Sequence, residues 1–458
     1  MYYNLKTFIF CEISVMYIKC FWFSLTIILS SYCYADTYIY LTNNSSETLD
    51  IRVSHTGYSG DTMQKRKEWN QNAYTVKPWE TKKVLTFNRN VGVKNNKSYK
   101  FSTEVTSESG SKVYLEQMLR GSFWGSSIKY KLSASGVTSY YKNNYSIHRF
   151  TSNKYSDSPT ELAFRSKQTA GFDDIYYTIT PSHNPKSSTT VSSTLKMLTY
   201  NVWALTPLAS HVNQRLDELP KFLTNYDVIS LQEVFYSDKR RSFLQNLAKE
   251  YPYQTKVLKA PSFYGLNVYD GGVIIVSKYP IVSKDYHVFS RCSGSDCLAD
   301  KGVVYAEVVK GGKSYHVFAT HAASTDSYSA RVDRIYQFWD INKFAKRQNI
   351  PKNEVVIFSG DFNVNKNKYF NHDYKWMQSL LNANEPKYSG HTAATYDKSL
   401  NSFVKSNSEY LDYVFVSNAY GKVKSNVNRV FIPRSTSNSL WYHWDLSDHF
   451  PVEAIIKQ

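Results

Sequence analysis

The stretch Val355–Asn363, VVIFSGDFN, is an apolar run that breaks at a glycine and then presents Asp361 and Asn363 together. Four further apolar runs end in the same way on polar residues, which are Asn201, Glu233, His321 and the pair Asp448 and His449. In an open α/β sheet the chemical groups gather at the carboxyl ends of the strands. We therefore expect these five endings to form one polar floor at one edge of a sheet.

The residue types on this floor indicate a chemistry. With Asp412, which begins a later apolar run, the set supplies carboxylates, amides and imidazoles but no thiolate. Oxygen ligands with open positions suit magnesium, which keeps several waters and meets substrate phosphate oxygens. The sequence has no glycine-rich nucleotide loop and no G-x-S-x-G nucleophile turn. The pattern therefore indicates attack of an activated water on a phosphoester, assisted by a divalent cation.

Composition limits the rest of the interpretation. The 458 residues fit two domains behind a leader. Lys and Arg outnumber Asp and Glu by 55 to 38, which suits an anionic partner such as a membrane surface, although a soluble basic protein has the same balance. The excess is spread along the chain and forms no basic arm, so we expect no nucleic-acid partner. We also expect a monomer.

Residues 1–35 have the pattern of a signal peptide. The segment Phe21–Ser30, FWFSLTIILS, is short for a membrane span and leads to a small-residue cleavage position at Ala35. Met16 makes the better start of the chain, and a retained membrane anchor is the alternative. We expect an exported, extracellular protein.

Two cysteines follow the predicted leader, Cys292 and Cys297. An even, closely spaced pair in an exported chain favours one disulfide. Two cysteines without a neighbouring histidine make a poor zinc site. Two free thiols are the alternative that the sequence leaves open.

Two differently patterned parts follow the leader. From 36 to 180, short alternating runs between turn residues predict an all-β, sandwich-like domain. Pro181–Thr194, PSHNPKSSTTVSST, has the composition of a flexible linker. From 195 to 458, apolar runs alternate with helical patterns, which predicts an α/β domain. The clearest helical pattern is Tyr328–Arg347, with apolar residues at Val332, Ile335, Tyr336, Trp339 and Phe344.

The all-β domain carries no catalytic constellation. Its many tyrosines, with Trp69, Trp79 and Trp124, could form a face that binds host glycan or lipid. Aromatic residues are also ordinary sandwich core, and we favour the core interpretation.

The motifs after the linker resemble, in their order, those of the exonuclease, endonuclease and phosphatase superfamily. They are TYNVW, LQEVF, ATH, SGDFN, LDYVFV and SDHFPVEA. Within that superfamily the chain looks most like the secreted bacterial neutral sphingomyelinases, through CLADKGVVYAEV at Cys297–Val308, TYD at Thr395–Asp397 and an aromatic run before the last motif. The resemblance implies an α/β four-layer sandwich, in which two packed β-sheets are flanked by helices.

The resemblance also implies roles for the floor residues. Glu233 would be the principal magnesium ligand, and Asn201 a close partner of the metal or the phosphate. His449 would be the general base, with Asp412 holding its imidazole in the useful tautomer.

The remaining floor residues receive supporting roles from the same resemblance. His321 and Asn363 would bind phosphoryl oxygens, and Asp361 would orient water or metal. Asp448 would support the metal site or His321.

An aromatic run, Leu440–Trp444, lies just before the last motif. By resemblance it would dock on membranes, through Trp441 and Tyr442 exposed at the interface and Trp444 either exposed or in the core. Four basic residues stay outside the predicted site: His287, His316 and His391 as structural residues and Lys301 as a solvated one.

The activity implied by the resemblance is magnesium-dependent hydrolysis of sphingomyelin in membranes to ceramide and phosphocholine, a phospholipase C reaction. Two alternatives remain at this point. One is a secreted deoxyribonuclease-like nuclease on the same fold, and the other is a glycan- or membrane-binding toxin with a vestigial catalytic fold.

Overall fold

The computed structural model describes residues 36–458 apart from 59–62, 64–65, 111, 134–145, 153–159, 169–173, 182–192, 261–267, 369–371, 436 and 441–442. The predicted signal peptide, most of the predicted linker, and Trp441 and Tyr442 lie outside the described residues. Among the helices that are described, none is both long enough and apolar enough to cross a membrane.

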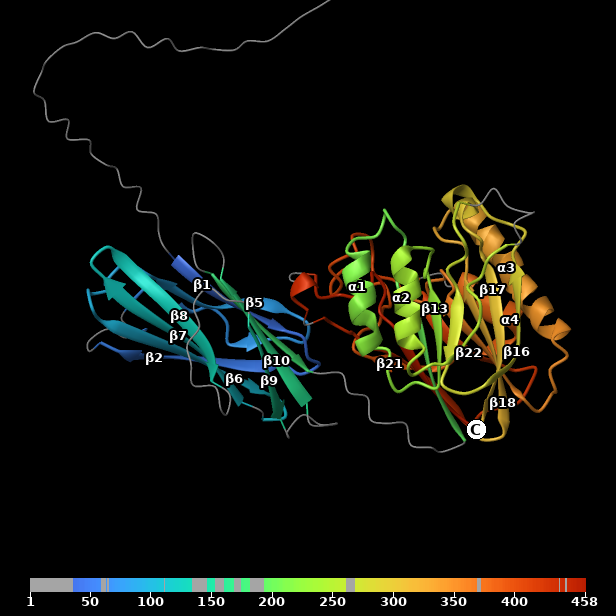
Figure 1. The fold of residues 1–458 in the computed structure, drawn as a ribbon, viewed down its shortest axis with the longest axis horizontal. Helices are drawn as coiled ribbons and strands as arrows, with labels where there is room; N and C mark the ends of the chain where they lie inside the picture. Colours follow the sequence, from blue (N-terminus) through green and yellow to red (C-terminus); the bar gives the residue numbers. More distant parts are fainter. Residues whose placement is uncertain are drawn as a thin grey trace, which may run out of the picture.

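The N-terminal lobe consists of two sheets that pack face to face (Figure 1). The first has the order β3-β5-β1-β11-β10-β9, with β1 Asp36–Asn43, β3 Trp69–Gln71, β5 Thr81–Asn88, β9 Ser146–Ser152, β10 Thr160–Gln168 and β11 Ile175–Pro181. The second has the order β4-β2-β6-β7-β8, with β2 Leu49–Gly57, β4 Thr75–Val76, β6 Ser98–Ser107, β7 Lys112–Ser122 and β8 Gly125–Ser133. Ile39 and Leu85 of the first sheet share one core with Phe101 and Leu115 of the second. The predicted all-β sandwich is confirmed.

The catalytic lobe begins with a seven-stranded sheet of order β14-β15-β13-β12-β24-β23-β21. Its strands are β12 Thr194–Asn201, β13 Val228–Gln232, β14 Tyr253–Gln254, β15 Ile274–Ser277, β21 Lys387–Gly390, β23 Ser425–Val430 and β24 Val452–Lys457. Helices α1 Val212–Glu218 and α2 Asp238–Leu247 cover its outer face, where Leu216 and Phe243 pack against Leu198 and Ile229. The short 3₁₀ helix η2, Leu219–Lys221, continues from α1.

A six-stranded sheet of order β16-β17-β18-β19-β22-β20 completes the lobe. Its strands are β16 Ile281–Val288, β17 Gly302–Lys310, β18 Lys313–His321, β19 Val355–Asp361, β20 Ala383–Asn384 and β22 Asp412–Ser417. Helices α3 Tyr328–Arg347 and α4 His372–Leu381 cover its outer face, and Phe338 and Met377 pack there against Phe318 and Phe358. Two 3₁₀ helices lie in the loops, η3 Gly294–Leu298 and η4 Asn438–Leu440.

The inner faces of these two sheets form a separate core. Met197 and Val228 of the first sheet meet Val317 and Ile357 of the second. The predicted four-layer sandwich, two packed sheets flanked by helices, is therefore confirmed (Figure 1).

Helix α3 has the predicted bounds but a different buried face. Of the apolar residues used to predict it, Phe344 is buried, whereas Tyr336 and Trp339 are exposed. The buried face also includes Arg334 and Gln337, because the ends of both side chains bond to loop backbone: Arg334 donates to the carbonyl of Ala323 at 2.9 Å. Burial of polar side chains that find backbone partners cannot be read from apolar spacing.

The two lobes contact each other through Arg434. Its guanidinium donates to Asn44 Oδ1 at 2.7 Å and to the carbonyl of Trp79 at 3.4 Å, both in the N-terminal lobe. The Trp79 ring lies 5.0 Å from that of His391 in the catalytic lobe. The predicted division at residues 181–194 therefore separates two cores that share a contact surface, although the division itself stays a prediction.

The three tryptophans singled out in the N-terminal domain have three different environments. Trp69 is fully buried in the sandwich core, and Trp79 lies between the lobes. Trp124 is 92% exposed. The core interpretation is therefore right for Trp69 and wrong for Trp124, because Trp124 lies at a hairpin turn where no second sheet can cover it.

Candidate active site

Four strands from two sheets bring their last residue, or in β13 the residue directly after it, to one place. The pairs β12–β13 and β18–β19 are each parallel, so Asn201 and Glu233 end side by side in one sheet and His321 and Asp361 in the other. Asn201 joins the sheets, because its Nδ2 donates to Glu233 Oε1 at 2.8 Å and to Asp361 Oδ2 at 3.1 Å. This arrangement is the polar floor expected from the strand endings.

His449 approaches this floor from the loop before β24. Its Nδ1 lies 2.8 Å from Asp412 Oδ2, and Asp412 is the register partner of Asp361 across β22 and β19. Ser447 fixes the loop, because its hydroxyl donates to the carbonyl of Asn201 at 2.6 Å. The carboxylate–imidazole pair is therefore tied to the end of β12.

A cavity of about 510 Å³ opens over this floor. Glu233, His321, Asp361, Asn363 and His449 all line it. Its rim is apolar and aromatic, made of Leu205, Leu208, Phe235, Tyr269, Leu298 and Tyr396. Asn201, Asp412 and Asp448 are not among its lining residues and lie behind those that are.

Burial and mutual repulsion raise the pKa values of three carboxyl groups here. Desolvation, opposed by hydrogen bonding from Asn201 and by the charge of Lys301, raises the pKa of Glu233. Desolvation and the charge of Asp412 raise the pKa of Asp361 to about 6. Desolvation, with a contribution from Glu233, raises that of Asp448 to about 6 as well. Such a group of crowded carboxylates favours a cation.

The two histidines of the site have opposite electrostatic environments. Burial and the nearby positive charge of Lys301 hold the pKa of His321 well below its usual range, so this imidazole is neutral. Burial also opposes the charge on His449, but the carboxylates of Asp412 and Asp361 outweigh it and hold the pKa of His449 well above its usual range. Perturbation of this kind in a cavity marks functional groups.

The donor atoms fit a hard divalent cation. Ligand atoms of Asp361, Asp412 and His449 all lie within 4.8 Å of one another. Asp412 Oδ1 is buried without a hydrogen-bond partner among the described residues. Glu233 adds a carboxylate at the cavity wall, whereas Asn201 uses its amide to orient Glu233 and Asp361 and accepts from the Trp203 N–H through Oδ1. Oxygen donors of this kind suit magnesium.

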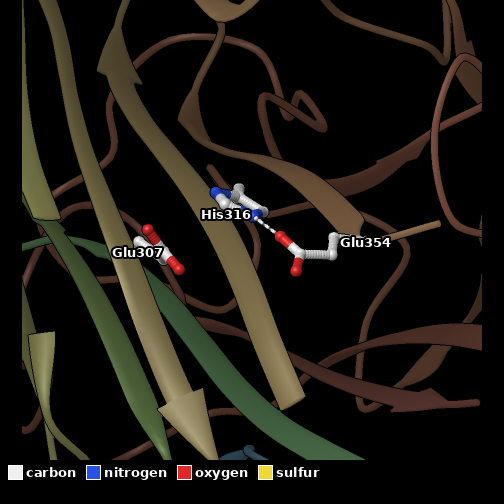
Figure 2. A group of neighbouring side chains, drawn as sticks. All are labelled: Glu307, His316 and Glu354. Atoms are coloured by element: carbon white, nitrogen blue, oxygen red, sulfur yellow. Dashed lines mark hydrogen bonds and ion pairs between the residues drawn. The ribbon is translucent and has the colours of Figure 1, made fainter. Parts of the chain in front are cut away.

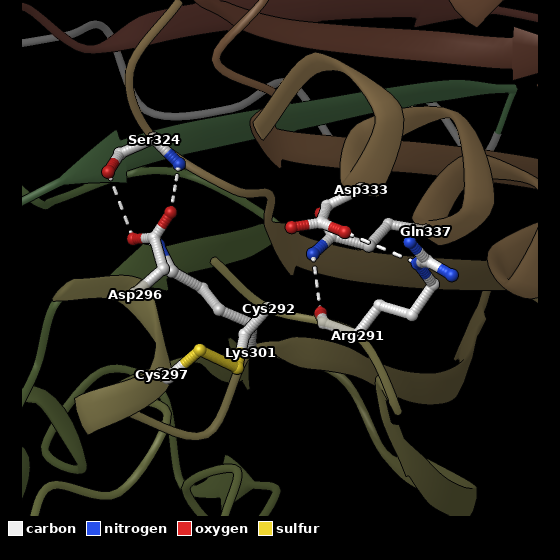
Figure 3. Close-up of a disulfide and its surroundings, with 8 residues drawn as sticks. All are labelled: Arg291, Cys292, Asp296, Cys297, Lys301, Ser324, Asp333 and Gln337. Atoms are coloured by element: carbon white, nitrogen blue, oxygen red, sulfur yellow. Dashed lines mark hydrogen bonds and ion pairs between the residues drawn. A yellow bond between two sulfur atoms is a disulfide. The ribbon is translucent and has the colours of Figure 1, made fainter. Parts of the chain in front are cut away.

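Lys301 is a cavity residue, and its interpretation as a solvated lysine is wrong. It is only 7% exposed, and its Nζ donates to the carbonyl of Ala322 at 3.1 Å and lies 3.5 Å from Asp296 Oδ1. Figure 3 shows Lys301 and Asp296 beside the disulfide. The Asp-Lys-Gly context in the sequence resembles a turn, but β17 begins at Gly302 and buries the lysine stem.

The structure pairs Cys292 with Cys297 in a disulfide (Figure 3). The bridge closes the loop that presents Asp296. This carboxylate accepts from the backbone N–H of Ser324 at 2.6 Å and from its hydroxyl at 2.9 Å. The closed loop therefore joins one wall of the cavity to the segment that follows His321.

Arg215 was not singled out in the sequence, although it supports the site from behind. It is completely buried on α1 and donates to the carbonyls of Val202 at 2.8 Å and of Leu446 at 2.9 Å. These carbonyls belong to the loops that follow Asn201 and precede His449. An arginine in a polar-looking helix gives no signal of such a role.

A second group of possible metal ligands lies at the other end of the same sheet and comprises Glu307, His316 and Glu354 (Figure 2). His316 Nε2 lies 2.6 Å from Glu354 Oε2, and its Nδ1 lies 2.8 Å from the Tyr305 hydroxyl. Both ring nitrogens therefore have protein partners, in agreement with the structural role predicted for His316. His287 lies 3.9 Å from Asp340, and His391 contacts Trp79.

The predicted membrane-docking run is only partly visible. Trp444 is half-buried, and its carbonyl accepts from the Ser435 N–H at 2.7 Å. Trp441 and Tyr442 lie outside the described residues, so the docking role of the run stays a prediction.

The catalytic lobe matches a known protein family. Residues 198–449 match the model of the Endonuclease/Exonuclease/phosphatase family. Sphingomyelinase C of Bacillus cereus is 38% identical over 308 residues, which span 60% of this chain and 92% of the relative. Phospholipase C of Staphylococcus aureus is 36% identical over 292 residues, 57% of this chain and 87% of the relative.

Solved structures agree with these sequence matches. Beta toxin from Staphylococcus aureus, in a mutant crystallised with bound magnesium ions, has a TM-score of 0.53 at 34% identity and covers 58% of this chain and 99% of its own. Sphingomyelinase C from Streptomyces griseocarneus has the same TM-score at 30% identity, with the same coverage of both chains.

Proposed function

This chain belongs to the endonuclease/exonuclease/phosphatase family and is a phosphoric diester hydrolase of the sphingomyelinase C type, and from that premise we propose that it cleaves sphingomyelin to ceramide and phosphocholine. Water attacks phosphorus, and the bond between phosphorus and the ceramide oxygen breaks. Ceramide leaves as an alcohol that keeps this oxygen and takes up a proton, and phosphocholine carries the oxygen of the water. The family match covers residues 198–449 of the catalytic lobe, and the relatives are matched over nearly their whole length. The products, the export of the chain and the roles of single residues are parts of the proposal.

His449 is the group that takes a proton from the attacking water. Its Nδ1 faces Asp412 at 2.8 Å, so in the neutral ring the N–H lies on that nitrogen and the Nε2 lone pair faces the cavity. Because the pKa of His449 is raised, this neutral form gains population as pH rises or as a bound cation neutralises the neighbouring carboxylates. Asp412 holds this tautomer and stabilises the imidazolium that forms. The carboxylate is completely buried, which strengthens its interaction with the ring.

His321, Asn363 and Lys301 line the same cavity as His449 and would face the phosphoryl group. His321 is neutral and donates one N–H without adding charge. The Asn363 amide and the Lys301 ammonium supply further donors beside it. Donors fixed before the reaction stabilise the charge that develops on phosphoryl oxygens.

Glu233 and Asp361, oriented by Asn201, are the residues that would hold Mg²⁺, with Asp448 behind them. When bound, the cation supplies charge neutralisation at the phosphate and lowers the pKa values of the surrounding groups. The bound magnesium ions of the related beta toxin support this assignment. The raised pKa values of Glu233 and Asp361 support it independently, because a bound cation would offset the repulsion between these crowded carboxylates.

The cavity rim is the observation that favours a lipid over a nucleic acid. Leu208 and Leu298 are exposed at the cavity, and among the described residues that line it Lys301 is the one lysine or arginine. A nuclease groove contacts several phosphates and therefore needs several basic side chains. An apolar rim over one anion-binding floor fits a single phosphodiester headgroup whose acyl chains remain in a membrane.

One side-by-side assay tests the proposal. The purified protein with magnesium is given sphingomyelin liposomes, phosphatidylcholine liposomes and plasmid DNA, and phosphocholine release and strand cleavage are measured. We expect release from sphingomyelin and intact DNA. Cleavage of DNA with inert liposomes would establish the nuclease, and inactivity on all three substrates would establish the vestigial fold.

Export is supported by two features of the chain. The leader pattern at 1–35 precedes the described residues, and the Cys292–Cys297 disulfide suits an oxidising compartment. Mass spectrometry of the secreted fraction, with and without reduction, tests both features together.

A further inference from the structure

Among the described side chains of the N-terminal lobe, the most exposed aromatic ones lie at one hairpin. Strands β7 and β8 are joined by two residues, Phe123 and Trp124, which we call the aromatic tip. They are 78% and 92% exposed, and their rings meet edge to face with centroids 4.9 Å apart. Neither side chain is part of the sandwich core.

The composition of the aromatic tip has no explanation in turn geometry. Two-residue hairpin loops favour Asn, Asp and Gly, which adopt positive φ easily. Here the loop residues are the two largest apolar types, and neither has a positive φ. Exposure of two such side chains to water is unfavourable, so a role outside the folded lobe is the simplest reason for them.

Basic residues lie on the strands of this hairpin and on the segments that contact its base; we call them the basic collar. They are Arg89, Lys94, Lys97, Arg120 and Lys129. Arg89 donates to the carbonyl of Ser126 at 2.8 Å, and the carbonyl of Lys97 accepts from the Gly121 N–H at 2.9 Å, which places both segments against the base of the hairpin. The segments 88–103 and 117–133 contain no Asp or Glu, and Asp36 and Glu68 lie beside Asn88 at the start of the first segment.

The aromatic tip lies far from the contact between the lobes. Strand β2 begins at Leu49, opposite Ser107, close to the segment of Asn44 that meets Arg434. From there, the paired strands β2, β6 and β7 extend to their far ends at Gly57, Tyr99 and Leu119. The tip lies beyond these three residues, roughly 30 Å away at the rise of an extended strand. Figure 1 shows the β7–β8 hairpin on the side of the lobe away from the catalytic lobe.

We propose that this hairpin is a membrane anchor, in which the aromatic tip enters the interface of a bilayer and the basic collar meets anionic lipid headgroups. Tryptophan and phenylalanine settle at the boundary between headgroups and acyl chains. Lysine and arginine near the surface add attraction to anionic lipid. The positive charge of the collar and the apolar tip favour a lipid surface over a neutral glycan, because a neutral glycan offers no negative charge for the collar to bind.

The anchor goes beyond the proposed hydrolysis, because it binds lipid without cleaving it. Its location on the accessory lobe makes it separate from the catalytic floor and from the aromatic run before His449. It would raise the concentration of enzyme at a membrane, and it would leave turnover of a dissolved substrate unchanged.

Vesicle sedimentation tests the anchor without catalysis. The full chain is mixed, in chelator, with vesicles free of sphingomyelin, made either of phosphatidylcholine alone or of phosphatidylcholine and phosphatidylserine at roughly four to one. We expect preferential binding to the anionic vesicles and weaker binding as salt rises. The double variant Phe123→Ser with Trp124→Ser should bind at least about tenfold more weakly.

Two further variants separate the contributions. Lys94→Gln with Lys97→Gln and Arg120→Gln should lose the preference for anionic vesicles, by about tenfold or more, while keeping the tip. Tyr74→Ser is the matched control, because Tyr74 is a 72% exposed aromatic residue of the same lobe beside β4, at the other end of the sheet. It should bind like the wild type. All substituted side chains are exposed, and equal melting temperatures verify the fold.

Three results would overturn the anchor. The first is equal vesicle binding by wild type and the double tip variant, whether strong or absent. The second is capture of the wild type by immobilised glycans and not by vesicles, lost in the tip variant. The third is a concentration-dependent dimer of the wild type that the tip variant abolishes while vesicle binding persists. None depends on hydrolysis, so failure of the anchor and failure of the proposed function are distinguishable.

Discussion

Two histidines on one strand of this protein each lie beside carboxylates, but their environments differ. Strand β18 carries His316, whose neighbours are Glu307 on β17 and Glu354 just before β19, and it ends at His321 beside Asp361. The two histidines are an odd number of positions apart, so their side chains leave opposite faces of the sheet. His321 shares its face with Val317 and Ala319, between the sheets, and His316 shares its face with Phe318, under α3.

The comparison shows that the same residue types can have different roles when their surroundings differ. Around His316, Glu354 and Tyr305 occupy both ring nitrogens. At the other end, His321 Nδ1 and Asp412 Oδ1 are buried without a partner among the described residues, and the neighbouring carboxyl groups have raised pKa values. Satisfied polar groups stabilise a fold, whereas unsatisfied ones beside a cavity are available for a ligand.

Of the substitutions at these two ends, Glu233→Gln should have the largest effect on activity. This change removes a carboxylate from the proposed metal site while keeping the shape of the side chain, so activity on sphingomyelin should fall to background and calorimetric binding of magnesium should be lost. Chelation should have the same effect on the wild type, reversibly. Full activity in chelator would contradict a metal-dependent site.

His449→Ala should be the next largest change. Loss of a general base lowers the rate by roughly 2 to 4 orders of magnitude, and kcat should fall with little change in magnesium affinity relative to Glu233→Gln. Because His449 accepts a proton only when neutral, the wild-type rate should rise with pH. A variant within a few fold of wild type would show that another residue takes the proton.

Removal of magnesium should make stability depend on pH at the catalytic end. The pKa values of Asp361 and Asp448 are about 6 in the folded chain, above the value of about 3.9 in an unfolded one. As pH rises from about 4 to about 6, the unfolded state loses these protons first, so the metal-free protein loses up to about 3 kcal/mol for each group. The raised pKa of His449 acts in the same direction, since its stabilising contribution is lost as pH rises through that pKa.

Urea unfolding in chelator measures this loss. The slope between pH 4 and 6 should be much smaller in the double variant Asp361→Asn with Asp448→Asn, and magnesium should remove it in the wild type. A metal-free protein that gains stability over this range would contradict the crowding of carboxylates at the site.

The smallest change is expected at His316. His316→Ala leaves Tyr305 and Glu354 without their partner and should lower the free energy of unfolding by roughly 1 to 3 kcal/mol. Glu354→Gln, at a partly exposed carboxylate, should cost less, about 0.5 to 1.5 kcal/mol. Neither should alter kcat or magnesium affinity. A loss of divalent-cation binding in either variant would make this second group a metal site and end the distinction between the two ends.

Much of the catalytic lobe could be predicted because its signals are local. Strand endings such as Thr199–Asn201 and Ser359–Asn363 combine an apolar run with a polar stop, and parallel strands of one sheet bring such stops to one edge. The eight residues of the expected floor therefore come together in space. The bounds of α3 were predictable for the same reason, since helical spacing is a property of neighbouring residues.

Other features depend on partners far along the chain. Lys301 looks like a solvated turn lysine until the loop closed by Cys292 and Cys297 covers it, and Arg215 gives no signal until two loops place their carbonyls around it. The exposure of Trp124, compared with the burial of Trp69, could not be predicted from composition either.

The sequence by itself determined which residues end the strands, the α/β class of the catalytic lobe and the chemistry of its floor, because alternation and polar stops act over a few residues. The four-layer arrangement was implied by the resemblance of its ordered motifs to a known superfamily. Only the tertiary structure decided which of two histidines on one strand faces the cavity, which lysine is buried there and which tryptophan is left at a hairpin tip. The physical reason is that burial and hydrogen-bond satisfaction are set by segments that meet only after folding.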